Sequence, residues 1–132
     1  MAFYIHQTDD GRVPGFEFMP CSAIIPKVGM AMKVTSGNLA VASAADKPTY
    51  ISMTERTTAC TAGDLIPVIR VNPDIIFEVS TPSSFSQAVG VKAKLGSDGI
   101  SLQNASGGTA EIVYTDSSIT RVRFVEPDAV GG

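Results

Sequence analysis

Residues that commonly carry catalysis are scarce in this chain, which has one histidine, two cysteines and no tryptophan. The histidine, His6, has no nucleophile motif beside it, so the sequence predicts no catalytic triad. Cys21 and Cys60 lie far apart without another cysteine or a histidine nearby, which is not the spacing of a zinc site. Neither a phosphate-binding loop nor a dinucleotide fingerprint occurs. We therefore expect a protein that is not an enzyme, with no catalytic residues, no cofactor and no metal.

The chain is also poor in charge: charged residues make up 17% of it, and its net charge is −3. Its lysines and arginines are scattered, so we expect no general attraction to nucleic acid or to an anionic membrane. No apolar run approaches the roughly 20 residues of a membrane-spanning helix, and the first residues lack the basic and apolar regions of a signal peptide. These absences predict a protein made in the cytoplasm, whose two cysteines are buried thiols rather than a disulfide.

Strand and turn signals are abundant by contrast. Hydrophobic residues make up 44% of the chain, and 12 glycines and eight prolines separate short stretches of alternating apolar and polar residues. At 132 residues the chain can build one core. We expect an all-β fold, either a small β-barrel or a sandwich, with at most one short helix over residues 80–89. The expected parts are an irregular N-terminal arm (1–28), a β-rich body (29–127) and a frayed C-terminus (128–132).

The densest apolar run, residues 63–79, predicts a two-strand unit at the centre of the core. Residues on either side of Asn72-Pro73-Asp74 alternate with a period of two, and these three residues are typical of a turn. A three-residue loop would place Arg70 opposite Glu78, although this register remains open because it asks Ile75 for an unfavourable backbone conformation. Further upstream, a loop at Gly37-Asn38 predicts a hairpin that pairs Val34 with Val41.

The last third of the chain predicts a meander, in which each strand pairs with the next. If its three turns are two-residue hairpins, one apolar row crosses neighbouring strands through Leu102, Val113 and Val122. The same register places Tyr114 opposite Arg121 and Ile112 opposite Arg123 on the other face. Aromatic, apolar and arginine side chains together are typical of an interface. The alternative is that a second sheet covers this face.

The N-terminal arm contains several large apolar side chains that a free tail would not normally expose. They are Phe3, Tyr4, Phe16, Phe18 and Met19. We expect this arm to dock, either on its own body or on another chain.

Together these features resemble the head decoration proteins of tailed phages, also called capsid cement. The resemblance covers roughly residues 25–80. It rests on a small β body, a Pro- and Gly-containing N-terminal arm, and an apolar strand that leads through Pro73-Asp74 into Ile75-Ile76-Phe77-Glu78. Such proteins bind the outer face of the expanded capsid, often as trimers, with an arm that becomes ordered on the capsid.

The resemblance implies that this chain is a structural virion protein on the capsid exterior. Its partner would be the major capsid protein, and a homotrimer is one arrangement of its own copies. Phe16 and Phe18 would anchor the arm, and Tyr114, Arg121 and Arg123 would form a contact surface on the body. The full set of candidate interface residues is Phe3, Tyr4, Phe16, Phe18, Ile112, Tyr114, Arg121 and Arg123.

Two other functions remain as alternatives. The first is a ligand- or glycan-binding β-barrel module, such as a receptor-binding tip domain. The absence of tryptophan counts against sugar stacking in such a module. The second is a small enzyme on a β-barrel, which the missing acid–base pairs make the least favoured of the three.

Overall fold

A computed structural model describes residues 2–8, 11 and 15–126 of the chain. These residues form strands and connections, and no helix occurs among them, so the expectation of an all-β fold is confirmed. Within the same residues there is no helix long and apolar enough to cross a membrane. The strands are β1 (Tyr4–Thr8), β2 (Glu17–Cys21), β3 (Ala31–Thr35), β4 (Asn38–Val41), β5 (Tyr50–Ser52), β6 (Asp64–Arg70), β7 (Ile75–Ser80), β8 (Lys92–Leu95), β9 (Leu102–Ser106), β10 (Ala110–Thr115) and β11 (Ile119–Phe124).

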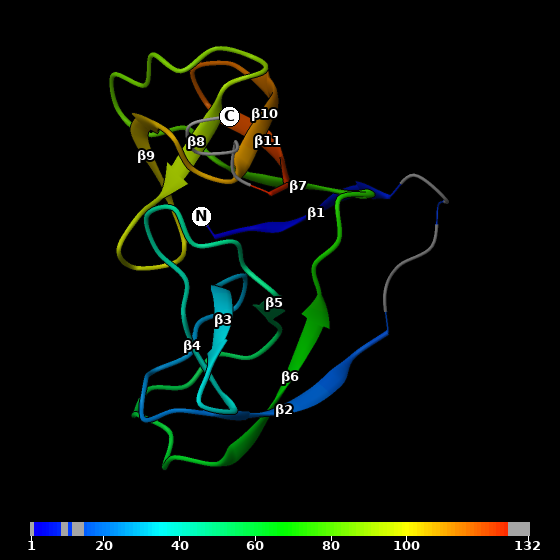
Figure 1. Ribbon diagram of the computed structural model, residues 1–132, viewed down its shortest axis with the longest axis vertical. Helices are drawn as coiled ribbons and strands as arrows, with labels where there is room; N and C mark the ends of the chain where they lie inside the picture. Colours follow the sequence, from blue (N-terminus) through cyan, green and yellow to red (C-terminus); the bar gives the residue numbers. More distant parts are fainter. Residues whose placement is uncertain (1, 9–10, 12–14, 127–132) are drawn as a thin grey trace.

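The strands form two parts (Figure 1). A closed five-stranded barrel has the order β2-β4-β3-β5-β6, and a six-stranded antiparallel sheet has the order β1-β7-β11-β10-β8-β9. In the view of Figure 1 the sheet lies above and the barrel below, and the chain passes from one to the other after β6. The choice between barrel and sandwich that the sequence left open therefore resolves as a barrel with a sheet packed beside it.

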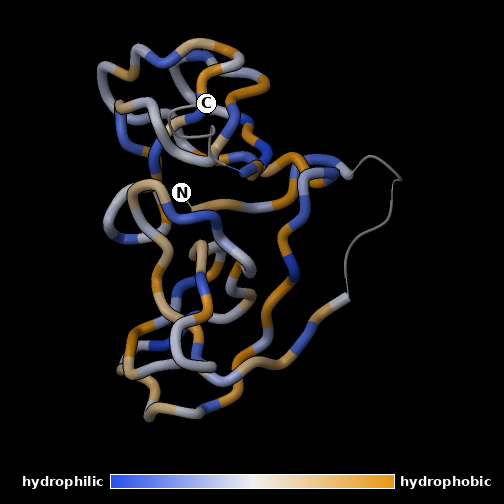
Figure 2. Tube along the Cα trace, viewed as in Figure 1, coloured by the Kyte–Doolittle hydropathy of each residue, from blue (hydrophilic) through white to orange (hydrophobic). Residues whose placement is uncertain are grey.

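The core consists of two apolar clusters. One fills the barrel, the other contains residues of both the barrel and the sheet, and β6 contributes to both. Ile66 and Val68 point into the barrel, whereas Ile69 points the other way and joins a second cluster with the apolar face of the sheet. Figure 2 shows hydrophobic residues along the length of β6. A strand buried on both faces needs apolar residues in consecutive positions rather than in strict alternation. This requirement explains the consecutive buried residues Val68 and Ile69, whereas Leu65, earlier in the strand, is exposed.

The predicted two-strand unit over residues 63–79 is wrong as a hairpin. Its first half is β6 in the barrel and its second half is β7 in the sheet, and the two strands do not pair with each other. Arg70 lies opposite Tyr50, and Glu78 lies opposite Tyr4 and Arg121. The turn at 72–74, where the Asn72 side chain accepts a hydrogen bond from the Asp74 amide (2.9 Å), carries the chain between the two parts.

The expectation of an irregular arm over residues 1–28 is also wrong, because this segment contributes a strand to each part of the fold. β1 pairs with β7 in the sheet, and β2 pairs with β6 in the barrel. Phe3 is fully buried and its ring meets the ring of Phe124 edge-on, with centroids 5.3 Å apart. The predicted frayed end at 128–132 lies outside the described residues.

The predicted meander is correct in its strands but not in their order. β10 pairs with β8 rather than with β9, so β9 forms the edge of the sheet and β8 lies between them. The row through Leu102, Val113 and Val122 therefore does not form. After β9 the chain crosses to the other side of β8, where β10 pairs with it. At this crossing the amide of Gly108 donates a hydrogen bond to the carbonyl of Lys92 (3.0 Å).

One smaller expectation, the register of the first hairpin, needs correction. The β3–β4 hairpin turns at Ser36 and Gly37, both with positive φ (50° and 82°), as a tight hairpin of the mirror-image type requires. Val34 consequently pairs with Leu39 and not with Val41. The expectation of at most one short helix over residues 80–89 agrees with the structure: after Ser80, which ends β7, these residues form turns, in one of which the Phe85 amide donates to the Pro82 carbonyl (3.3 Å), and no helix.

Candidate functional site

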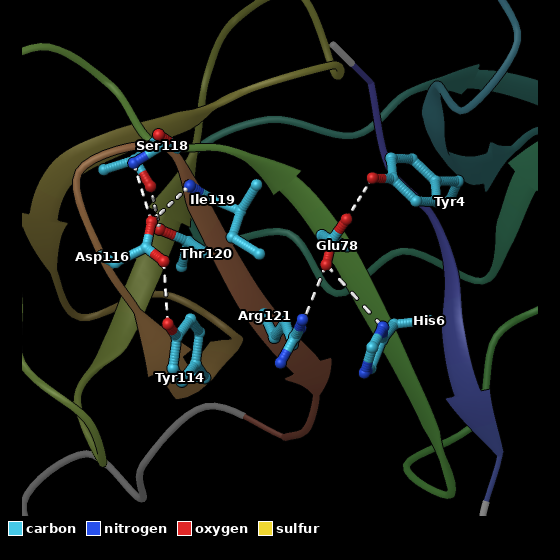
Figure 3. A network of polar contacts seen from close by, with 10 residues as sticks. Tyr4, His6, Glu78, Tyr114, Asp116, Ser118, Ile119, Thr120 and Arg121 are labelled. Carbon is cyan, nitrogen blue, oxygen red and sulfur yellow. Dashed lines mark hydrogen bonds and ion pairs between the residues drawn. The ribbon is translucent and has the colours of Figure 1, made fainter.

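A row of polar and aromatic side chains crosses four strands of the sheet (Figure 3). Tyr4 on β1 lies opposite Glu78 on β7, Glu78 lies opposite Arg121 on β11, and Arg121 lies opposite Tyr114 on β10. We call these four residues the tyrosine–arginine row. The predicted pairing of Tyr114 with Arg121 is thus confirmed, and the structure adds Tyr4 from the other end of the chain.

Glu78 is the centre of this row. It is 8% exposed, and its carboxylate accepts hydrogen bonds from the Tyr4 hydroxyl and from Nε of Arg121 (3.0 Å). Nδ1 of His6 lies 3.7 Å from the same carboxylate. The hydrogen bond from Tyr4, followed by that from Arg121, lowers the pKa of Glu78 below its ordinary value of 4.5. The carboxylate is therefore ionised and fixed in position at neutral pH.

The other end of the row is equally well ordered. The guanidinium of Arg121 lies 4.8 Å from the centre of the Tyr114 ring, and the Tyr114 hydroxyl donates to Asp116 (2.8 Å). Asp116 also accepts from the backbone amides of Ser118 (2.7 Å) and Ile119 (2.9 Å), which lower its pKa. This arrangement presents two half-exposed tyrosine rings on a rigid surface.

Removing the charge of Glu78 tests how much this row stabilises the fold. We expect Glu78→Gln to lower the free energy of unfolding at pH 7 by about 1–3 kcal/mol, because the amide cannot accept from both donors. The folded-state pKa of Glu78 is lowered, so the carboxylate contributes stability above the unfolded-state pKa and loses it as the pH falls through the folded-state value. The difference in stability between the Glu78→Gln variant and wild-type protein should therefore shrink below about pH 4.

Urea titrations monitored by circular dichroism between acid and neutral pH would measure this dependence. Tyr4→Phe is the matched control, because it removes one donor and leaves the carboxylate paired with Arg121. If the stability difference between Glu78→Gln and wild-type protein stays constant across the pH range, the ionised Glu78 carboxylate is not what stabilises this row.

Three of the candidate interface residues occupy other places than the sequence predicts. Phe3 and Ile112 are buried in the core. A β-bulge between Ile112 and Tyr114 changes the register, so Ile112 pairs with Val122 and points inward while Tyr114 stays outside. Arg123 lies opposite Glu111 rather than Ile112, and its Nη1 donates to the carbonyl of Pro73 (3.2 Å).

A second surface lies on the outside of the barrel, where β2 pairs with β6. Phe18 lies opposite Pro67, and Pro20 lies opposite Leu65. Phe18 and Leu65 are 64% and 60% exposed, and Phe16, just before β2, is 62% exposed. We call these five residues the apolar strip: Phe16, Phe18, Pro20, Leu65 and Pro67. The strip brings together the two predicted anchor residues and Pro20 from the same segment with Leu65 and Pro67, which the sequence assigned to the core.

The charged residues beside the apolar strip are paired with one another. The guanidinium of Arg70 donates two hydrogen bonds to Glu17 (3.0 and 3.1 Å), and Arg56 lies 3.1 Å from Asp64. The hydrogen bond from Arg70 lowers the pKa of Glu17. These pairs leave the strip apolar and close to neutral, which suits a partner with an apolar surface of its own.

Leu65 and Pro67 were missed as site residues because their segment was assigned to the core. The available signal was period-two alternation: both residues share one side of the strand, and proline cannot donate from a buried ladder position. The six-stranded sheet covers this side of β6 at Ile69 but not at Leu65. The difference depends on where the six-stranded sheet ends.

An open hollow of about 490 Å³ lies at the end of β7, between residues 81–85 and 115–117. Hydroxyl groups of serine and threonine predominate in its lining, with Phe85 as its one aromatic ring and Asp116 as its one acid. Asp116 is already occupied by three hydrogen bonds. Among the described residues, no group of three histidine, cysteine or acidic side chains is arranged to hold a metal ion.

Comparison of the chain with protein-family models, with curated proteins and with solved structures finds no match in any of the three.

Proposed function

We propose that this chain is a structural protein that binds the outer surface of a phage capsid and stabilises the expanded head. The observation that carries the proposal is the apolar strip, in which Phe16, Phe18 and Leu65 are each at least 60% exposed on, or directly before, the paired strands β2 and β6. Large apolar side chains exposed together mark surfaces that bind other proteins. The partner would be the major capsid protein, and the protein would lie on the virion exterior.

The structure changes how such binding would work. The sequence implied an arm that becomes ordered on the capsid, whereas Phe16 and Phe18 project from or beside a strand of the closed barrel. A preorganised surface loses less conformational entropy on binding than a free arm does, so more of the buried apolar area contributes to affinity. The half-exposed rings of Tyr4 and Tyr114 form a second rigid contact surface on the sheet.

Co-sedimentation with emptied, expanded capsids tests the proposal. We expect wild-type protein to be taken up stoichiometrically and Phe18→Ser to reduce affinity by about thirtyfold or more, as loss of a central aromatic contact does. Val89→Ser is the matched control, because Val89 is 62% exposed but lies outside the strip.

Light scattering of the free protein, run alongside, reports whether it is a monomer or a trimer. Wild-type protein that does not sediment with expanded capsids would contradict the proposal. Equal binding by Phe18→Ser and Val89→Ser would show that the apolar strip is not the contact.

The hollow at the end of β7 favours a second candidate, a ligand- or glycan-binding module. Its hydroxyl-rich lining and single aromatic ring, Phe85, are compatible with a small polar ligand. A glycan array with wild-type protein and Phe85→Ala would test this function. Binding that is lost in Phe85→Ala, together with no uptake onto capsids, would favour the second candidate over the first.

A further inference from the structure

The barrel contains two free cysteines that the surfaces described above do not use. Cys21 is the last residue of β2 and is fully buried, and Cys60, on the connection between β5 and β6, is 3% exposed. Both belong to the apolar cluster inside the barrel, beside residues such as Leu39 and Ile66. The expectation that both cysteines are buried is therefore confirmed, and the question is what this pair can do.

Backbone hydrogen bonds join the two segments that carry these cysteines, and both side chains lie in the same buried cluster. The carbonyl of Cys21 accepts from the amide of Gly63 (2.8 Å), and the amide of Cys60 donates to the carbonyl of Ile24 (2.8 Å). Segments 21–24 and 60–63 thus run side by side. Burial, followed by the interaction with Cys60, raises the pKa of Cys21 to about 12. The nearest charged groups, Arg56 and Asp64, are paired with each other at 3.1 Å.

We propose that Cys21 and Cys60 form an intramolecular disulfide when the protein meets a small-molecule disulfide as oxidant. The bond would join the end of β2 to the connection that precedes β6, on the inside of the barrel. It would close a loop that contains β3, β4 and β5. The inference holds whether or not the chain binds a capsid.

The chemistry is thiol–disulfide exchange with oxidised glutathione as the test oxidant. The thiolate of one cysteine attacks the glutathione disulfide, which forms a mixed disulfide and releases one glutathione thiolate. The second cysteine, after losing its proton, attacks the protein sulfur of this mixed disulfide and releases the second glutathione. Two protein thiols are oxidised, one glutathione disulfide is reduced to two thiols, and the two thiol protons pass to the released glutathione.

Burial makes this exchange slow without making it unfavourable. A thiol whose pKa is raised to about 12 is almost entirely protonated at neutral pH, so the folded protein reacts slowly until the barrel opens. The equilibrium depends instead on whether the folded backbone holds the two sulfur atoms within bonding reach. A bond that fits the fold constrains mainly the unfolded chain, so the folded protein favours it more than the unfolded chain does.

The test is the equilibrium between the dithiol and the disulfide in glutathione buffers, measured for folded protein and for protein in urea. The equilibrium is approached once from fully reduced and once from fully oxidised protein. The reaction mixtures are then quenched with acid and analysed by intact mass. We expect a chain that loses two hydrogens, without a glutathione adduct. We expect the equilibrium constant to be about a hundredfold larger in the folded protein than in urea.

Cys21→Ser and Cys60→Ser are the matched variants, because each leaves one thiol that can form only a mixed disulfide or remain free. An equilibrium constant that is equal or smaller in the folded protein would overturn the proposal, as would mixed disulfides or disulfide-linked dimers as the main wild-type product. Because the comparison is an equilibrium one, slow access of glutathione to the barrel does not change its outcome.

Discussion

Replacing Gly108 with alanine is expected to lower the free energy of unfolding by about 3 kcal/mol or more, the upper end of what overpacking costs. A Cβ at this position would lie 2.1 Å from the carbonyl oxygen of Ala93 and 2.6 Å from Cα of Lys94. Both are backbone atoms of β8, which cannot move aside as a flexible side chain can. The added methyl group would separate the chain from β8 and break the hydrogen bond from Gly108 to Lys92.

Gly107 provides the matched control for this substitution. Its φ is +87°, so alanine there is strained by about 1–2 kcal/mol, but the only neighbour of an added Cβ is the flexible end of Lys94, at 3.7 Å. Gly107→Ala should therefore cost less than Gly108→Ala in urea or thermal unfolding, although only Gly107 has a left-handed backbone. The reverse order would show that the chain does not pass this close to β8.

The same contact explains why the order of the last four strands was not predictable from the sequence. Hairpin rules pair each strand with the next one, and Ser106-Gly107-Gly108 has the composition of a simple turn. In the structure these residues instead carry the chain past β8, where Gly108 touches the backbone of Ala93. Glycine permits both a tight turn and a close backbone approach, so its presence cannot distinguish them.

The candidate surfaces show what local rules can and cannot predict. The pairing of Tyr114 with Arg121 was predictable, because it depends only on the turn at Asp116 and on the register of one hairpin. The β-bulge that turns Ile112 inward was not, since no residue in β10 marks it. The partner of Glu78 was not predictable either, because Tyr4 comes from a distant segment that the sequence assigned to an irregular arm.

The all-β class followed from composition and alternation, which act residue by residue. The division of residues 63–79 between barrel and sheet depends on contacts between distant segments. Asn72-Pro73-Asp74 is compatible with a hairpin and with a crossover alike, and β6 finds its partners in β2 and β5. Long-range pairing therefore determined which of two locally acceptable structures formed.

Replacing Phe3 with alanine is expected to lower the free energy of unfolding by about 3–5 kcal/mol, as is typical when a buried aromatic side chain is removed. Phe3 is fully buried, and its ring meets that of Phe124, which in turn lies 5.6 Å from the ring of Phe77. The amide of Phe3 also donates to the carbonyl of Gly29 (3.0 Å), which ties the start of β1 to the chain just before β3. Phe3 is therefore part of the core, and β1 after it is part of the sheet and not of an arm.

Phe18→Ala distinguishes this role from that of the exposed phenylalanines, since Phe18 is 64% exposed and lies on the apolar strip. We expect Phe18→Ala to change the free energy of unfolding by no more than about 0.5 kcal/mol. Phe3→Ala, in contrast, should remove a large share of the protein's free energy of unfolding. Urea titrations of both variants under the same conditions measure the difference. If Phe3→Ala unfolds at the wild-type urea concentration, β1 is not packed into the sheet, and the pairing of Tyr4 with Glu78 on the same strand fails with it. If it is destabilised as expected while Phe18→Ala is not, then Phe3 holds the fold together and the exposed Phe18 does not, so the aromatic side chain of Phe18 needs another explanation than stability, such as the binding proposed above.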